Sequence, residues 1–555
     1  MFTPKPAGLA RAPAARWRRA VLALWLGAML ALGLAGCGSL PKDVERPVSQ
    51  ALAEPTATPL GRLAAQRRPP SARERDSGFA LIDSANMAYS SRLALTRQAS
   101  RTLDIQYYAI HADASTAELL REVRAAAARG VRVRILLDDF HSTGQDALVM
   151  GMAFLPGVEM RMFNPLPGGR GAGMLRALGS LHDFQRMQHR MHNKLYIADN
   201  AWGITGGRNL GDAYFGTADG SNFIDMDVLA VGPVVQAMSA SFDRYWNNPL
   251  AYPVQSLVTP AELRALRASV DGGANGAGAE PVQTNAAAAR MAVDEAAPAN
   301  GADKPPPALP AALELAQLPL IWASAALLVD EPSKLVPELN DAHTEDTVVD
   351  GMLSLLQQAR ADALIVSPYF VPGPRMMQVF AELRRRGVRL RVLTNSLASN
   401  DAPLAHVGYA RYRKQLVHLG VELYEMRAQH SVHLDRTVFG SGAGGSKASL
   451  HSKMLIIDGR VISIGSMNLD LRSKLQNTEV ALVIRSRTLS RQAAAELEDA
   501  LDDSVWRLEL TPEGRLLWRA PPGAEFDDAQ DEPDASLGLR LILNILGPLA
   551  PDEML

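Results

Sequence analysis

The chain has 555 residues, of which 47% are hydrophobic and 21% are charged. This is the composition of a globular protein, and the length suggests two or more domains with ample core. The formal net charge of −2 provides no overall basic field, which argues against a nucleic-acid-binding protein. Cys37 is the only cysteine, so a disulfide within the chain is excluded and a cysteine-based metal site is disfavoured.

The N-terminus is basic and is followed by an apolar run from Ala20 to Gly36 that ends at Cys37. This order predicts a secretory signal over residues 1–37. The ending Leu-Ala-Gly-Cys resembles the lipobox of bacterial lipoproteins, in which Cys37 would become the acylated first residue of the mature chain. The alternative is an uncleaved anchor, although the run is at the lower limit for spanning a bilayer. Both interpretations place the body in the bacterial cell envelope, facing the periplasm beside a membrane.

Two segments have an amino-acid composition typical of linkers. Residues 38–75 are rich in Pro, Ala and Arg and are predicted to form a tether, and the low-complexity stretch near 271–312 is predicted to be flexible. The expected division is a first domain at 76–258, a helix and linker at 259–317, a second domain at 318–510 and a C-terminal tail with an apolar segment at 511–555.

The segments on either side of the low-complexity stretch repeat one another. RGVRVRIL at 129–136 parallels RGVRLRVL at 386–393, and the same order of neighbouring blocks recurs, which indicates an internal duplication. Helix-like segments alternate with apolar strand-like ones in each half, which predicts an α/β fold with buried sheets. We therefore expect two homologous domains related by a pseudo-twofold axis. Helices are expected at 83–99, 115–129, 346–360 and 374–386, and strands at 102–108 and 363–368.

One pattern of polar residues occurs in both halves. It consists of His-x-Lys, an Asp five residues after the Lys, and an Asn ten residues after the Asp. Two copies at the same spacing are not expected by chance. The pattern comprises His192, Lys194, Asp199 and Asn209 in the first half, and His451, Lys453, Asp458 and Asn468 in the second.

The residues after each His-x-Lys, LYIA and MLII, are typical of a strand. Side chains two apart on a strand point to the same side, so each His is expected beside its Lys. If the halves face each other, two His, two Lys and two Asn converge, which suits a phosphate diester. Neither copy has an acidic cluster beside its His, so no metal is expected. No nucleotide-binding loop is present, and no cofactor is expected.

Two histidines indicate two-step chemistry. One attacks phosphorus to form a phosphoenzyme, and the other protonates the leaving oxygen and then activates the incoming hydroxyl. Each imidazole needs an orienting acceptor. The candidates are Asp227 in DMDVLAV and Glu479 in NTEVALV, which are repeat-related blocks.

The doubled pattern resembles the phospholipase D superfamily, over about residues 76–510. The blocks TLDIQYY, RMHNK and GGRNLGDAYFG look most like bacterial cardiolipin synthases of the C type. The resemblance implies two α-β-α sandwich domains with the active site at their interface, His192 as nucleophile and His451 as general acid. It also implies that Asp199 and Asp458 mainly support the structure. The chain departs from the family at Asp227, where Glu is common.

The implied activity is a phosphatidyltransferase that forms cardiolipin by moving a phosphatidyl group onto the headgroup hydroxyl of phosphatidylglycerol. Phosphatidylethanolamine is a second candidate substrate, and contact with a membrane surface is expected. A hydrolytic phospholipase D, a secreted nuclease or phosphodiesterase, and a non-catalytic envelope lipid-binding lipoprotein remain alternatives. The apolar stretch 536–549 is expected on the bilayer surface or docked as a core helix. Tyr107, Tyr108, Tyr369 and Phe370 either line an acyl groove or pack the core.

Overall fold

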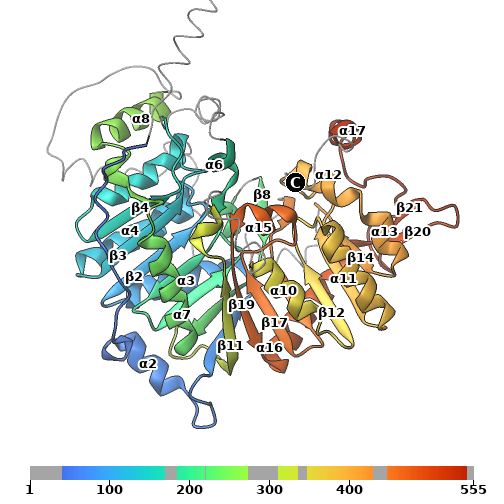
Figure 1. Cartoon of the computed structure of the whole chain (residues 1–555), viewed down its shortest axis with the longest axis horizontal. Coiled ribbons are helices and arrows are strands. Elements are labelled where there is room, and N and C mark those ends of the chain that lie inside the picture. The colour runs from blue at the N-terminus through green and yellow to red at the C-terminus, as the bar shows by residue number, and fades with distance from the viewer. Residues whose placement is uncertain are drawn as a thin grey trace, which may run out of the picture.

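The computed structural model describes residues 40–168, 170, 184–218, 220–272, 310–335, 347–428 and 447–546. The expected signal peptide with Cys37, and most of the low-complexity stretch, lie outside these described residues. Figure 1 shows the blue-to-green half and the yellow-to-red half side by side, with β11 and β19 of the second half at the junction. Within the described part of the chain, the helices are too short or too polar to cross a membrane.

A continuous sheet runs through both halves. Its two halves mirror each other in strand order about the antiparallel pair of β1 and β11, which places the pseudo-twofold axis between these strands. The order is β10 (Ala251–Pro253), β4 (Val158–Phe163), β3 (Arg132–Asp138), β2 (Thr102–Tyr107), β6 (Leu195–Ala198), β7 (Trp202–Gly206), β9 (Asp227–Val231), β1 (Ser77–Ile82), β11 (Ile321–Val329), β19 (Val480–Arg485), β17 (Val461–Gly465), β16 (Met454–Ile457), β12 (Asp362–Val366), β13 (Arg389–Asn395), β14 (Glu422–Met426), β20 (Val505–Leu510) and β21 (Leu516–Arg519).

The central strand pair requires a glycine. Gly78 of β1 lies opposite Trp322 of β11, and a Cβ atom at position 78 would lie 2.9 Å from the Trp322 ring. Because real Cβ atoms do not approach ring carbons so closely, this pairing depends on the missing side chain.

Helices cover both faces of the sheet. Along β3, Val133 and Ile135 share a hydrophobic cluster with α3 and α4, whereas Leu136 shares another with α7. Alternating strand residues thus face different helical layers. The cluster on the α7 side also contains α16 and strands of the second half, so this core crosses the pseudo-axis. The helices are α2 (Pro59–Arg67), α3 (Ala85–Gln98), α4 (Ala114–Ala128), α6 (Phe184–Gln188), α7 (Pro233–Trp246), α8 (Pro260–Gly272), α10 (Val348–Leu356), α11 (Gly373–Arg385), α12 (Pro403–Ala410), α13 (Arg413–His418), α15 (Leu471–Leu475), α16 (Arg487–Asp503) and α17 (Leu537–Leu546).

Two short parallel strand pairs join the halves outside this sheet. Each pairs a strand that precedes a motif histidine with a strand from the other half. They are β5 (Arg190–Met191) with β18 (Asn477–Thr478), and β8 (Ser221–Ile224) with β15 (Lys447–Leu450).

The expected helices and strands of both repeats are present, but the edges of the predicted domains need correction. The described residues from 40 onward are not a free tether, because Arg161 and Arg132 donate hydrogen bonds to the carbonyls of Pro47 and Gln50 and α2 packs beneath Trp202. Residues 310–320, expected in the linker and second domain, contribute Leu315 to the core of the first half. The predicted tail begins with β21, which extends the sheet.

Candidate active site

The two motif histidines enter the site from equivalent positions. The backbone N–H of His192 donates to the carbonyl of Thr478 at 2.9 Å, and that of His451 donates to the carbonyl of Ile224 at 2.7 Å. Each histidine is therefore held by the backbone of the opposite half. The short strand pairs explain these contacts. The strand before His192, β5, pairs with β18 of the second half, and the strand before His451, β15, pairs with β8 of the first half.

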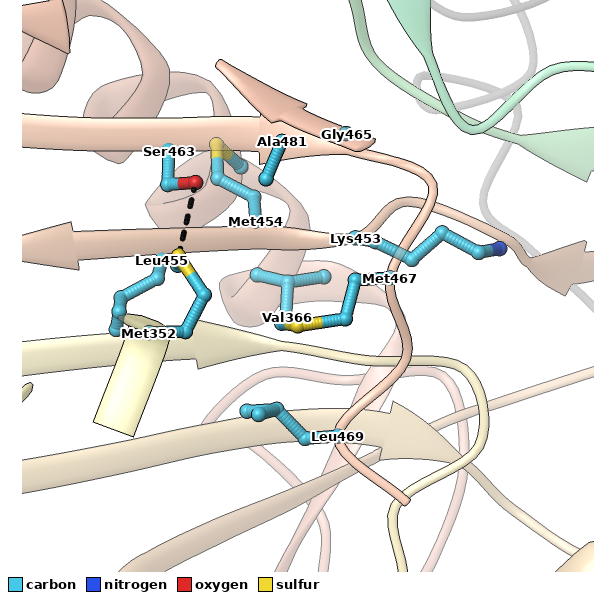
Figure 2. A pocket seen from close by; sticks show the side chains of 10 residues that line it. All are labelled: Met352, Val366, Lys453, Met454, Leu455, Ser463, Gly465, Met467, Leu469 and Ala481. Carbon is cyan, nitrogen blue, oxygen red and sulfur yellow. Dashed lines mark hydrogen bonds between the residues drawn. The ribbon is translucent and has the colours of Figure 1, made fainter. Parts of the chain in front are cut away.

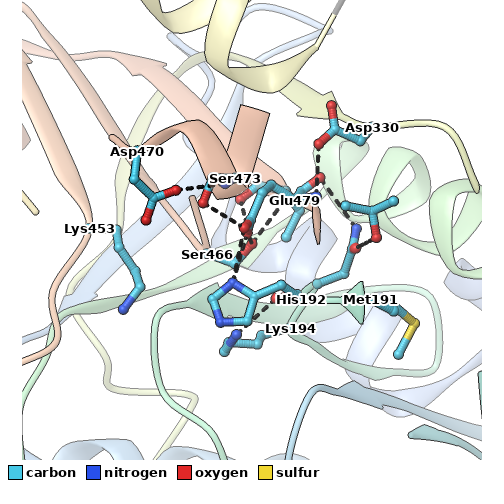
Figure 3. Close-up of polar contacts among 12 residues, drawn as sticks. Met191, His192, Lys194, Asp330, Lys453, Ser466, Asp470, Ser473 and Glu479 are labelled. Carbon is cyan, nitrogen blue, oxygen red and sulfur yellow. Dashed lines mark hydrogen bonds and ion pairs between the residues drawn. The ribbon is translucent and has the colours of Figure 1, made fainter. Parts of the chain in front are cut away.

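His192 is oriented by Glu479 of the second half. Its Nδ1 lies 2.9 Å from Glu479 Oε2 and 3.1 Å from Oε1. Ser466 Oγ donates to Oε2, and Ser473 Oγ donates to Oε1 at 3.1 Å, so both carboxylate oxygens are fixed (Figure 3). The predicted role of Glu479 as an orienting carboxylate agrees with this geometry, which leaves Nε2 of His192 available to substrate.

His451 is oriented by Asp225 of the first half, not by Asp227 as expected from the sequence. Nδ1 of His451 lies 2.7 Å from Asp225 Oδ2. Asp227 instead forms buried ion pairs with Arg92 at 2.8 Å and with Arg208 at 3.6 Å. Asp227 therefore stabilises the first half, and the orienting role passes to Asp225.

The strand register explains this error. Gly206 pairs with Asp227 in the first half, whereas the equivalent Gly465 pairs with Ala481 in the second. The residue two positions before Ala481 is Glu479, and the residue two positions before Asp227 is Asp225. Aligning DVLAV with EVALV thus shifted the comparison by two residues, the repeat of a strand. The sequence DMD contained the needed signal, since its two carboxylates are spaced to share one side.

The motif lysines lie beside their histidines. Nζ of Lys194 donates to the carbonyl of His192 at 2.8 Å, and Nζ of Lys453 donates to that of His451 at 2.5 Å. Burial lowers the pKa of Lys194 to about 7 and that of Lys453 to about 8. The two ammonium groups lie close enough for each to affect the pKa of His192. The structure thus brings both His-Lys pairs into one site.

Burial also sets the charge of the histidines and carboxylates. Desolvation, followed by the nearby lysines, lowers the pKa of both His192 and His451 well below the usual value. Desolvation raises the pKa of Glu479 to about 7 and raises that of Asp225 as well, and lysines oppose both rises. An anion bound between the two lysines would favour their charged forms, so the site is suited to a phosphate diester.

The two motif asparagines differ in their contacts. Nδ2 of Asn209 donates to the hydroxyl of Tyr214 at 3.0 Å, and its Oδ1 accepts from the backbone of Ala109 at 3.3 Å. Oδ1 of the buried Asn468 has no partner among the described residues. Asn468 is therefore freer to turn toward a bound phosphate than Asn209.

Asp199 and Asp458, grouped with the catalytic candidates, do not lie in the site. Each follows the far end of the strand that begins after its lysine, in a turn with positive φ. Their carboxylates accept hydrogen bonds from backbone N–H groups at the start of β2 and β12, including those of Thr102 and Asp362 at 3.0 Å each. Both residues fix these turns, which agrees with the supporting role that the resemblance implied and corrects their grouping with the catalytic residues.

Aromatic rings border both histidines. Tyr108 lies edge-on to His192 with ring centroids 5.0 Å apart, and Tyr214 lies edge-on to His451 at 5.4 Å. Phe223 also contacts His451, at 5.0 Å. Of the aromatic residues singled out in the sequence, Tyr107 and Phe370 are buried in the core, whereas Tyr108 contacts the site.

A small cavity of about 10 Å³ lies behind the backbone of Lys453, among Met352, Val366 and Leu469 (Figure 2). This volume holds no more than one water molecule. The Lys453 ammonium points away from the cavity, so the cavity belongs to the core and not to the substrate site (Figure 2).

The family profile described as "Cardiolipin synthase, PLD-like domain" matches residues 93–246 and 352–501, one match in each half. The chain belongs to the phospholipase D superfamily. It is 36% identical over 472 residues to cardiolipin synthase C of Escherichia coli K12, covering 84% of this chain and 94% of that protein. Cardiolipin synthase B of Salmonella typhi is 22% identical over 438 residues, covering 79% and 84% respectively.

The solved structure of phosphatidylserine synthase from Haemophilus influenzae Rd KW20 has a similar fold. Its TM-score is 0.55 at 14% identity, and the match covers 89% of this chain and 100% of that one. The superfamily and the two-domain α/β fold predicted from the sequence are therefore confirmed. The chain is a cardiolipin synthase-like phosphatidyltransferase of this superfamily.

Ser466 shows how one superfamily position is used differently in the two halves. A Cβ at the equivalent Gly207 would lie 2.5 Å from the carboxylate of Asp225. In the second half the Ser466 hydroxyl donates to the longer Glu479 side chain. Among the described residues, no group of three or more His, Cys, Asp or Glu side chains could hold a metal ion.

Proposed function

We propose that this protein forms cardiolipin by transferring a phosphatidyl group from one phospholipid to a headgroup hydroxyl of phosphatidylglycerol. The observation that carries the proposal is the convergence of two buried His-Lys pairs, each histidine oriented by a carboxylate of the other half. Cardiolipin synthase C of Escherichia coli, with 36% identity over 84% of this chain, supports the choice of substrate.

The first step uses His192 as nucleophile. With its Nδ1–H donated to Glu479, the neutral imidazole presents the Nε2 lone pair to phosphorus. The anionic diester bound beside His451 favours its protonated form, with a proton on Nε2 as well as on Nδ1. The Nε2–phosphorus bond of His192 forms, the bond to the leaving oxygen breaks, and His451 gives its Nε2 proton to that oxygen. Lys194 and Lys453 stabilise the charge that develops on the non-bridging oxygens.

The second step runs through the same groups in reverse. His451 accepts the proton of the incoming hydroxyl, the new oxygen–phosphorus bond forms, and the bond to His192 breaks. Glu479 stabilises the imidazolium-like charge on His192 while phosphorus is attached. No metal or other cofactor has a role in these steps.

Product analysis tests the activity. The purified full chain would be incubated with phosphatidylglycerol vesicles, with and without phosphatidylethanolamine, and the lipids measured by mass spectrometry. We expect cardiolipin, together with free glycerol or free ethanolamine according to the donor. Phosphatidic acid as the sole product would replace transfer with hydrolysis, and cleavage of DNA without lipid turnover would favour a nuclease.

Membrane contact is proposed to occur through α17. Three apolar side chains on one side of this helix are exposed, namely Leu537 by 84%, Leu541 by 59% and Ile545 by 55%. Docking of this side into the core is therefore excluded in the described structure. The helix contacts α12, where Leu404 is 51% exposed. Asp401 lies just before α12 and is close enough to Lys453 to raise its pKa. Figure 1 shows α17 beside α12.

Vesicle binding tests this contact. In a chain that begins at residue 40, and so lacks both the apolar run and Cys37, replacing Leu537, Leu541 and Ile545 by Ser should weaken co-sedimentation with phosphatidylglycerol vesicles roughly tenfold or more. Val48→Ser is the matched control, since Val48 is exposed on the N-terminal segment. Equal binding by the triple variant and the control would remove α17 from the membrane surface.

The proposed location is the bacterial envelope, with Cys37 acylated and the body in the periplasm. The N-terminal sequence pattern supports this proposal. Labelling with a radioactive fatty acid should modify the wild type and not Cys37→Ala. Incorporation into both would contradict acylation at Cys37.

A further inference from the structure

A second histidine–carboxylate pair lies near the candidate active site. His111 Nδ1 is 2.9 Å from Asp146 Oδ2, with side chains exposed by 34% and 27%. Asp146 Oδ1 accepts the backbone N–H of Ala112 at 2.8 Å, and the backbone of His111 donates to Leu210 at 2.9 Å. The imidazole is thus fixed through Nδ1, while Nε2 has no hydrogen-bond partner among the described residues.

Aromatic contacts connect this pair to both motif histidines. The His111 ring stacks on Tyr214 at 6.3 Å and 10°, and Tyr214 lies edge-on to His451. His111 is also 6.2 Å from His141, which contacts Tyr108, and Tyr108 contacts His192. Since His111 is more exposed than the motif histidines, it lies on the first-half wall, farther out than both.

The charges around His111 limit the ligand. Asp146, Asp113 and Asp212 raise the pKa of His111 although burial opposes them. Three carboxylates on this wall disfavour a second phosphate. Burial lowers the pKa of the adjacent His141 to about 4, so this ring is neutral. A hydroxyl suits Nε2 best because it can donate or accept a hydrogen bond.

We propose that His111, oriented by Asp146, binds a hydroxyl of the polyol headgroup on the acceptor lipid. The inference rests on the proposed transfer and concerns a hydroxyl adjacent to the one that reacts. The reacting oxygen bonds to phosphorus, the bond to His192 breaks, and the proton passes to His451. His111 takes no proton in this step. It positions the headgroup and so favours a polyol over a simple alcohol or water.

Competition between soluble alcohols tests this subsite. His111→Phe keeps a ring against Tyr214 and removes Nε2. With a phospholipid donor and either glycerol or 1-propanol as acceptor, the ratio of kcat/KM for glycerol to that for 1-propanol should fall about tenfold, the worth of one hydrogen bond. The fall should appear mainly in the KM for glycerol. His418→Phe is the matched control, since His418 is an exposed histidine at the end of α13.

Other outcomes separate the two proposals. An unchanged ratio, or an equal loss with both alcohols, would overturn the His111 subsite while leaving transfer intact. A wild-type protein that transfers to neither alcohol and only hydrolyses the donor would overturn the proposed function, and the subsite with it. Asp146→Asn provides a second variant and should lower the ratio in the same direction by a smaller factor.

Discussion

The two halves place their motif histidines on equivalent strands, but the carboxylates that orient these histidines differ. The first-half histidine, His192, uses Glu479, whose oxygens are held by Ser466 and Ser473. The second-half histidine, His451, uses the shorter Asp225, which lies against the glycine backbone at 207. The longer acid therefore requires a hydroxyl for support, and the shorter acid requires a glycine. Duplication preserved the geometry of the pair while its supporting residues diverged together.

The largest expected effect separates the two histidines by role. His192→Asn and His451→Asn should each lower phosphatidyl transfer at least about 10⁴-fold, because both steps need both groups. A donor with a p-nitrophenol leaving group needs no proton, so His451→Asn should still release a burst of p-nitrophenol, and His192→Asn should not. A burst from His192→Asn alone would reverse the roles. If both variants still performed the cellular function of the wild type, a non-catalytic lipid-binding protein would be favoured.

A smaller effect is expected from the acids. Asp225→Asn and Glu479→Gln remove the charge that orients each imidazole, and we expect kcat to fall about 10²- to 10⁴-fold with little change in folding. Steady-state kinetics with a soluble diester measures this fall. Aligning DVLAV with EVALV predicts the same loss of kcat for Asp227→Asn, whereas the strand register predicts none. This variant therefore decides between the two.

Asp227→Asn should act on stability instead. It leaves the buried guanidinium groups of Arg92 and Arg208 without their shared carboxylate, which should lower the free energy of unfolding by about 3–5 kcal/mol. Urea unfolding measures this change. Below the unfolding transition, kcat should stay within about threefold of the wild type, and a loss like that of Asp225→Asn would contradict the register.

The smallest expected effect concerns the lysines. Each ammonium is charged below its pKa, so kcat/KM for a soluble diester should fall as the pH rises above about 7, where Lys194 loses its proton first. Lys194→Arg keeps the charge and should move this limb to about 8, set by Lys453, while Lys453→Arg should leave it at about 7. If kcat/KM fell over the same pH range in both variants, neither lysine would determine the pH dependence.

The sequence predicted the repeats and the His-Lys pairs because spacing within one strand fixes which side chains share a side. It failed at Asp227 because the similar apolar residues that follow Asp227 and Glu479 allowed a shift of two, which only the pairing of β7 with β9 resolves. It also missed the His111–Asp146 pair. These residues come from separate segments without a shared pattern, and only the hydrogen bond between them and the packing of His111 on Tyr214 reveal the pair.

Each half supplies backbone and carboxylate contacts to the histidine of the other half. Because both halves belong to one chain, assembly of the active site does not depend on protein concentration. A chain with a single repeat could complete such a site only by finding a second copy, and dilution would dissolve the arrangement. Here the partner is supplied by the same polypeptide, at an effective concentration that dilution cannot change. Each half is then free to specialise, because it always meets the other half and never a copy of itself.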